Sequence, residues 1–327
     1  MKIRPFEWRD IPALHRYRRR GLFLDSRQLL TRGPVLVPAG AVLTSLASRT
    51  GIFTYLCEPG VQKGEPLIGQ VTHNGGATFA RLAFLAPESG VDAAGLPALF
   101  DQMAAEIGER GAFHLLAEVD DQSPAFRALH QAGFAIYARQ RIWRLDGAPP
   151  EPGGLAPWRA CSAGDLVAVR TLYNNLVPGL VQQVEPLPRE HLKGMVYYHP
   201  DGMHAYVELR YGSAGIWAQP FIHPDVEDLP ARLVRLLQML PGRQARPVYL
   251  CVRSYQSWLE PAIEALGAVP GPAQAVMVRH LALPRRAAEP YAMPAMNGTR
   301  TEPVARITNK MIDDRDVKLL GHDGKSL

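Results

Sequence analysis

The hydrophobic pattern of the first half of the chain predicts strands and helices in a mixed order. Short apolar runs between turn residues predict buried strands, and apolar residues at helical spacing predict amphipathic helices. The predicted strands cover 2–5, 50–57, 66–73, 77–86, 112–119 and 134–145, and the predicted helices cover 8–20, 25–32, 96–109 and 123–132. His73-Asn74-Gly75-Gly76 is typical of a tight turn, so its flanking strands should pair antiparallel. The pattern therefore predicts an α/β fold with a mixed sheet and helices on both faces.

Landmarks of this pattern recur in the second half. The recurring landmarks are Arg4 with Asp10 against Arg159 with Asp165, Leu96-Pro97-Ala98 against Leu229-Pro230-Ala231, and Gly133 against Gly267. Each begins or ends an element of the same type, and all occur in the same order along the chain. Such self-similarity predicts that the two halves arose by duplication and share one fold.

Composition shifts divide the chain into domains. The segment 146–157 is rich in proline and glycine and offers little to bury, which is typical of a linker. We therefore predict a first domain at 1–147, a linker at 148–154 and a second domain at 155–284. The remainder, 285–327, has few large apolar residues, so we expect a mostly disordered tail through which a partner could dock.

Composition and charge narrow the functional classes. The apolar fraction of 47% and the charged fraction of 20% are ordinary globular values, and the net charge of +5 is small for 327 residues. No apolar run approaches the roughly 18 residues that cross a bilayer, so we expect a soluble, cytoplasmic protein without membrane contact. The basic cluster at 15–20 is interpreted as a solvated helix face, and nucleic acid is not an expected partner.

Cysteine and histidine spacing does not predict a metal site. Cys57, Cys161 and Cys251 lie far apart along the chain, which favours free thiols over a disulfide or zinc site. The histidines of the second half, His191, His199, His204 and His223, match no common metal-site spacing, and we expect no bound metal.

Several motifs resemble the GNAT acetyltransferase superfamily. They are Ile3-Arg4-Pro5 followed by Asp10, Pro66 to Val71, Leu82 to Pro87, and Gln122-x-x-Ala125-x-x-x-Leu129-x-x-x-Gly133-Phe134. The resemblance covers nearly all of the first half and extends more weakly to the second through the repeat. It implies two tandem GNAT-like domains, each with a mixed, mostly antiparallel sheet splayed between its fourth and fifth strands.

The resemblance also implies an acyl-CoA site in the first half. In that family the pyrophosphate binds backbone N–H groups of a glycine-containing loop at a helix start, where unpaired donors and a partial positive charge favour an anion. The matching loop here is Gly90-Val91-Asp92-Ala93-Ala94-Gly95, with the pantetheine expected beside Leu85 and near Gln122. This loop departs from the family pattern at Gly90, where Gln or Arg is usual, and at Ala93, where glycine is usual.

The second half is less suited to an anion. Its corresponding loop, Asp225-Val226-Glu227-Asp228, has no glycine and three carboxylates, which would repel phosphate. We therefore expect acetyl-CoA, as cosubstrate, in the first half only.

Catalysis in the family often uses a tyrosine as general acid, and here Leu129 and Ile263 stand at that position. The carboxylates that could take a proton from an amine are Glu118, Asp120 and Asp121, at the end of a predicted strand, and His73 on a neighbouring turn is a further candidate base. One hypothesis is thus an acyl-CoA-dependent N-acetyltransferase acting on a small-molecule or peptide amine. The alternative is a non-catalytic GNAT-fold binding or scaffold protein that has lost cofactor binding.

Overall fold

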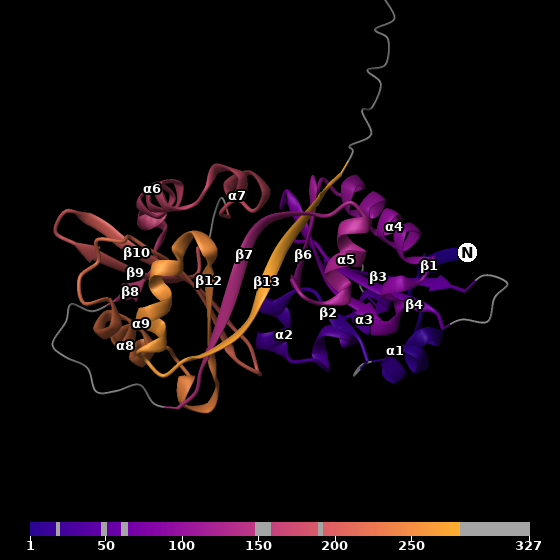
Figure 1. Cartoon of the computed structure of the whole chain (residues 1–327), viewed down its shortest axis with the longest axis horizontal. Coiled ribbons are helices and arrows are strands. Elements are labelled where there is room, and N and C mark those ends of the chain that lie inside the picture. Colours follow the sequence, from indigo (N-terminus) through magenta and orange to yellow (C-terminus); the bar gives the residue numbers. More distant parts are fainter. Residues whose placement is uncertain (18–19, 47–50, 60–64, 148–157, 189–191, 282–327) are drawn as a thin grey trace, which may run out of the picture. The chain divides into compact units, whose positions relative to one another are not determined.

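The first half begins with a short strand, β1 (Lys2–Pro5), followed by helices, and then continues into the strands of a sheet (Figure 1). The computed structural model describes residues 1–17, 20–46, 51–59, 65–147, 158–188 and 192–281. Its elements are β1 (Lys2–Pro5), η1 (Trp8–Asp10), α1 (Ile11–Tyr17), β2 (Leu22–Phe23), α2 (Ser26–Arg32), α3 (Leu36–Leu46), β3 (Ile52–Glu58), β4 (Leu67–Thr72), β5 (Phe79–Ala86), η2 (Glu88–Asp92), α4 (Leu96–Glu109), β6 (His114–Asp120), α5 (Pro124–Gln131) and β7 (Ala135–Leu145). No helix within these residues is long and apolar enough to span a bilayer.

The second half repeats this order. Its elements are β8 (Arg159–Ala160), η3 (Ala163–Asp165), α6 (Leu166–Leu176), α7 (Gly179–Val184), β9 (Gly194–His199), β10 (Gly202–Tyr211), β11 (Ile216–Ile222), α8 (Leu229–Met239), η4 (Arg243–Ala245), β12 (Val248–Arg253), η5 (Ser254–Leu259), α9 (Glu260–Glu264) and β13 (Val269–His280). Helices α4 and α8 each follow a strand and precede its parallel neighbour, β6 or β12. The two helices therefore occupy equivalent positions, as the repeat predicts.

The same local device opens each half. Arg4 Nη1 donates to Asp10 Oδ2 at 2.7 Å, and the same carboxylate accepts from the Glu7 backbone N–H at 2.9 Å. In the second half, Arg159 Nη1 donates to Asp165 Oδ2, also at 2.7 Å, and the Ser162 N–H donates to it at 2.8 Å. Each aspartate thus satisfies donors at the start of a helix while pairing with a strand arginine.

All strands of the described part form a single sheet. Its order is β1-β3-β4-β5-β6-β13-β7-β12-β11-β10-β9-β8, with β2 paired to β5 off this path. Most neighbours are antiparallel, and the β5–β6 and β11–β12 pairs are parallel. This is the mixed, mostly antiparallel sheet that the sequence predicts.

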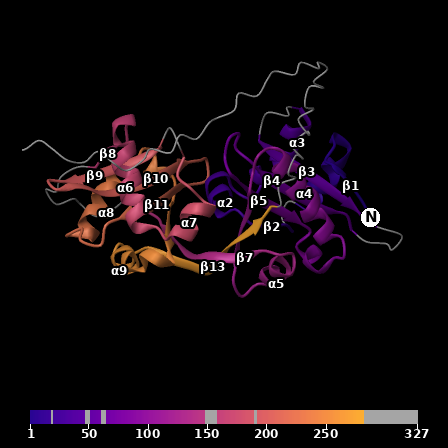
Figure 2. The ribbon, with the colours of Figure 1, turned by 90° about the horizontal axis from the view of Figure 1, so that it is seen from above.

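The two halves exchange their last strands. Strand β7 ends the first half but pairs with β12 of the second, whereas β13 ends the second half and pairs with β6 of the first. β7 and β13 also pair with each other, and both run between the halves (Figures 1 and 2). Because each half completes the sheet of the other, unfolding one half removes hydrogen-bond partners from the other.

Helices cover both faces of the sheet. In the first half, α4 and α5 pack on one face around Phe100 and Phe134, while α1 and α3 cover the other face. In the second half, α8 and α9 cover one face. Helices α6 and α7 cover the other face. Their buried side chains form one hydrophobic core with residues of β6 and β13, so this core contains residues of both halves.

The structure corrects three details of the sequence prediction. The helix expected at 8–20 is a short 3-10 turn followed by α1, and 18–19 lie outside the described residues. Helix α3 lies outside the predicted helices; its Pro38 lies in the first turn, where the missing N–H needs no partner. The two-residue strand β2 was also not predicted.

Two other sequence assignments cannot be compared with the structure. The predicted linker at 148–154 and the tail at 285–327 lie outside the described residues. The domain boundaries at 1–147 and 155–284 stay a prediction.

Candidate functional site

The parallel strands β5 and β6 diverge, as the family resemblance implies. They pair only from Phe79 with His114 to Arg81 with Leu116, and beyond that point their separation leaves an opening in the sheet. Strand β2 lies in this opening, with Leu22 opposite Leu85 and Phe23 opposite Phe84.

Leu24 extends this contact to both diverging strands. Its backbone N–H donates to the carbonyl of Ala83 at 3.1 Å, and its own carbonyl accepts from the N–H of Glu118 at 2.8 Å. The backbone of residues 22–24 thus occupies the hydrogen-bonding groups of β5 that face the opening. The family resemblance places the pantetheine at this same edge.

The loop expected to bind pyrophosphate lies at the start of α4, as predicted. Its two glycines, however, lie in close contact with side chains of the neighbouring strands. A Cβ added at Gly90 would lie 2.3 Å from Leu67 Cδ2, and one added at Gly95 would lie 2.9 Å from Cys57 Sγ. Packing by itself therefore accounts for both glycines. Ala94 and Asp92 are the exposed members of the loop, whereas Val91 and Ala93 are half-buried.

The other two predicted cofactor residues, Leu85 and Gln122, differ in burial. Leu85 is buried in the core that α4 and α5 share with the sheet. Gln122 is exposed, and its backbone N–H donates to Asp120 Oδ1 at 2.9 Å in the turn before α5.

The three candidate carboxylates have different surroundings. Glu118 is buried, and its carboxylate accepts from Arg81 Nη1 at 3.1 Å and from the Ser26 N–H at 3.0 Å. Asp120 caps its own turn through the Gln122 N–H, and Asp121 lies 4.0 Å from Arg139 Nε. The structure thus places Glu118 in an ion-pair network and the two aspartates in a separate turn.

The corresponding opening of the second half is also bridged by the chain. Strands β11 and β12 pair only from Ile216 with Val248 to Ala218 with Leu250. Beyond them, the buried side chain of Gln256 accepts from the Ile222 N–H at 3.2 Å and donates to the Pro220 carbonyl at 3.0 Å. The sequence pattern does not indicate this bridge.

Sequence reasoning missed a cluster of charges centred on Glu185, in the segment after α7. Its carboxylate accepts from Arg81 and, at 2.9 Å each, from Arg253 Nη2 and the Tyr137 hydroxyl. Arg27 Nη2 lies 3.7 Å from Oε1. The cluster therefore joins α2, β5, β7 and β12 through one carboxylate.

These contacts lower the pKa of Glu185. Burial would raise this pKa, but Arg81, Arg253 and Arg27 together with the Tyr137 hydroxyl lower it to about 2. The side chain is only 12% exposed. Glu185 is thus held as a carboxylate across the physiological range, which suits a structural or ligand-orienting anion and not a proton acceptor.

A cavity of about 480 Å³ lies beside this cluster. Its lining comes from both halves and combines polar and aromatic side chains. Among the lining residues are Arg27, Arg81, Arg210, Glu185, Glu208, Phe79, Phe221, Tyr173 and Tyr255. The volume is in the range of small-molecule sites, and the mixture of apolar walls with a few charged groups is typical of them.

Comparison with known proteins finds similar folds among solved structures. A tandem GNAT protein from the clavulanic acid biosynthesis pathway, solved without acetyl-CoA, gives a TM-score of 0.50 at 14% identity over 85% of this chain and 98% of that chain. A GCN5-related N-acetyltransferase from Sphaerobacter thermophilus gives 0.46 at 16% identity over 69% of this chain and 80% of that chain. An acetyltransferase of the GNAT family from Colwellia psychrerythraea gives 0.42 at 14% identity over 86% of this chain and all (100%) of that chain. No family model and no curated protein matches the sequence.

At these identities the similarity shows the fold. The chain has the tandem GNAT fold. Fold alone does not fix the reaction, so function has to be argued from the two openings and the cavity.

Proposed function

We propose that this chain is a non-catalytic binding protein built on the tandem GNAT fold, with a small molecule held in the central cavity. The observation that carries the proposal is the position of Leu22 to Leu24. These residues use the backbone groups of β5 and β6 that an inserted pantetheine would need. Displacing them would break β2 from β5 and expose Leu24, which is buried.

The cavity suits an anionic molecule with an apolar body. Among the described lining residues, three are arginines, Arg27, Arg81 and Arg210, and two are glutamates, Glu185 and Glu208, so arginines exceed glutamates by one within this part of the lining. Phe79, Phe221 and Tyr255 supply apolar surface for the rest of the ligand. Arginine favours carboxylate, sulfonate or phosphate groups because its planar fork donates two parallel hydrogen bonds.

A pair of matched tryptophan variants tests this proposal. Ala77→Trp fills the cavity from its wall, and Ala94→Trp adds the same bulk to the exposed part of the Gly90–Gly95 loop. The probe is 8-anilinonaphthalene-1-sulfonate, followed by fluorescence, with the uncharged N-phenyl-1-naphthylamine as the matched probe. We expect the full chain and Ala94→Trp to bind the sulfonate more tightly than the uncharged probe, and Ala77→Trp to lose this binding.

Calorimetric titration of the same three proteins with acetyl-CoA completes the test. We expect no binding to any of them. Sulfonate binding that is unchanged in Ala77→Trp would refute the cavity assignment. Acetyl-CoA binding that Ala94→Trp abolishes would instead support the second candidate function.

That second candidate is an acyl-CoA-dependent N-acyltransferase that transfers acetyl from acetyl-CoA to a small-molecule or peptide amine. The observation in its favour is that Gly90–Gly95 immediately precedes the 14-residue helix α4, whose N-terminus can attract a pyrophosphate. In this scheme Leu22 to Leu24 move aside, and Glu118, Asp120 or Asp121 takes the proton from the amine. Ala94 is the better position for this test than Gly95, because a side chain at 95 would collide with Cys57.

A further inference from the structure

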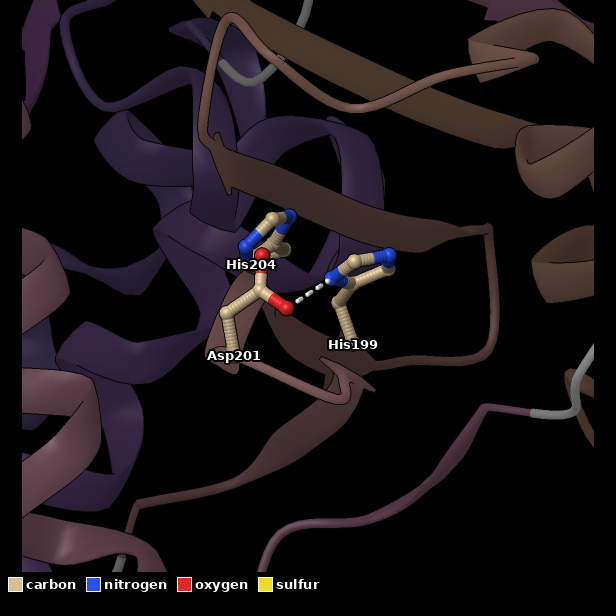
Figure 3. Close-up of side chains that lie close together, drawn as sticks. All are labelled: His199, Asp201 and His204. Carbon is tan, nitrogen blue, oxygen red and sulfur yellow. Dashed lines mark ion pairs between the residues drawn. The ribbon is translucent and has the colours of Figure 1, made fainter.

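A hairpin of the second half brings together side chains that can ligate a metal ion. One ligand atom each from His199, Asp201 and His204 lies within 4.8 Å of the others. The three side chains point toward one another, and His199 Nδ1 lies 3.0 Å from Asp201 Oδ1 (Figure 3). The imidazoles of His199 and His204 are stacked, with ring centroids 4.9 Å apart.

The local backbone explains why these residues meet. His199 ends β9 and pairs with Gly202, the first residue of β10, so only Pro200 and Asp201 form the turn. The pairing register then shifts between Met203 and Ala205, which makes His204 the extra residue of a β-bulge. Bulges re-aim side chains, and here the bulge sets His204 against His199.

The surroundings of this cluster are acidic and contain a third histidine. The cluster lines a cavity of about 260 Å³ together with His223, Asp225 and Glu227. The ring centroids of His204 and His223 are 5.7 Å apart, and His223 Nδ1 lies 3.5 Å from Asp225 Oδ2. A carboxylate beside a histidine is a common outer contact in metal sites, where it orients the ring.

Arg232 also lines this cavity, and its guanidinium contacts two other lining residues. Its Nε donates to the Glu227 carbonyl at 2.7 Å, and its charge lies over the Tyr197 ring at 4.3 Å. Among the described residues that line the cavity, the carboxylates of Asp201, Asp225 and Glu227 outnumber the single arginine.

We propose that His199, Asp201 and His204 form a binding site for a divalent transition-metal ion of the zinc type. Two imidazoles and one carboxylate are ligands that Zn²⁺ prefers, whereas Mg²⁺ and Ca²⁺ need more oxygen ligands. Tetrahedral ligands at zinc distances lie about 3.4 Å apart, so these side chains need only a small inward movement. His199 and Asp201 are exposed, which leaves them free to make it. Water or His223 completes the coordination.

Isothermal titration of the full chain with ZnCl₂ tests the site. His199→Ala, His204→Ala and Asp201→Asn each remove one ligand from an exposed hairpin, and His130→Ala removes an exposed histidine of α5 as the matched control. We expect the native chain and His130→Ala to bind Zn²⁺ equally. Each hairpin variant should weaken one binding event by at least about tenfold. MgCl₂ should give no comparable event.

Circular dichroism of each variant verifies that the fold is retained. Zinc binding with the same stoichiometry and affinity in His199→Ala and His204→Ala would overturn the proposal. So would Mg²⁺ binding as tight as Zn²⁺ binding, because the ligand set would then not discriminate. Both outcomes are independent of whether the central cavity binds a ligand.

Discussion

The substitution Glu185→Gln should destabilise the whole protein, because one carboxylate compensates arginines from several elements. The amide keeps the size of the side chain but removes the charge that faces Arg81 and Arg253. The pKa of Glu185 falls from 4.5 to about 2, and each unit corresponds to about 1.4 kcal/mol. The expected loss at pH 7 is therefore about 3 kcal/mol, which agrees with the cost of breaking a buried ion pair.

The pH dependence of this loss has a defined sign. A carboxylate whose pKa is lowered by folding stabilises the folded state above its unfolded pKa, and this contribution disappears as the pH falls toward the folded value. The difference between the native chain and Glu185→Gln should therefore be full at pH 7, about 40% of that value at pH 3, about a tenth of it near pH 2, and absent only near pH 1, below both pKa values. Other carboxylates also titrate in this window, but they cancel when the two proteins are subtracted.

Urea unfolding followed by tryptophan fluorescence measures this difference, because Trp143, Trp158 and Trp217 are buried. Glu109→Gln, at the exposed end of α4, is the matched control and should change the free energy of unfolding by less than about 0.5 kcal/mol. A Glu185→Gln protein within 1 kcal/mol of the native chain at pH 7, or a difference that does not shrink in acid, would refute the reasoning.

Three further predictions follow from local geometry. Phe100→Ala, which removes a buried ring 5.6 Å from Phe134, should cost about 3–5 kcal/mol in urea unfolding, and a loss as small as that of the exposed Phe113→Ala would contradict the assigned core. Asp10→Asn and Asp165→Asn should each lower the free energy of unfolding by about 1–3 kcal/mol. Each should also reduce the loss of stability at acid pH, because Arg4 and Arg159 lower the pKa of these carboxyls in the folded state. Unequal effects would argue against an equivalent role of the two aspartates. Burial raises the pKa of Cys251 to about 12, so this thiol should resist a disulfide reagent at pH 8 in the native protein. The half-buried Cys161 should react first. A fast phase of reaction that persists in Cys161→Ser would disprove this order.

The repeated architecture could be predicted from local patterns in the sequence. Helix periodicity placed α4, and the Leu-Pro-Ala landmark located α8 at the equivalent position, because both signals depend on a few neighbouring residues. The Arg4–Asp10 and Arg159–Asp165 pairs could likewise be located, since each spans only six positions. The divergence of β5 from β6 came from the family resemblance and is confirmed.

Which residues fill the openings and cavities of this architecture depends on long-range contacts that are visible only in the folded chain. The exchange of β7 and β13, the insertion of Leu22 to Leu24 between β5 and β6, and the Glu185 cluster all join residues far apart in the chain. Local propensity carries no information about such pairings, because their energy depends on which backbone groups and charges the completed sheet leaves without partners. The hairpin histidines show the same limit at short range. His199 and His204 are close in sequence, but a β-bulge sets one against the other, and no spacing rule indicates a bulge.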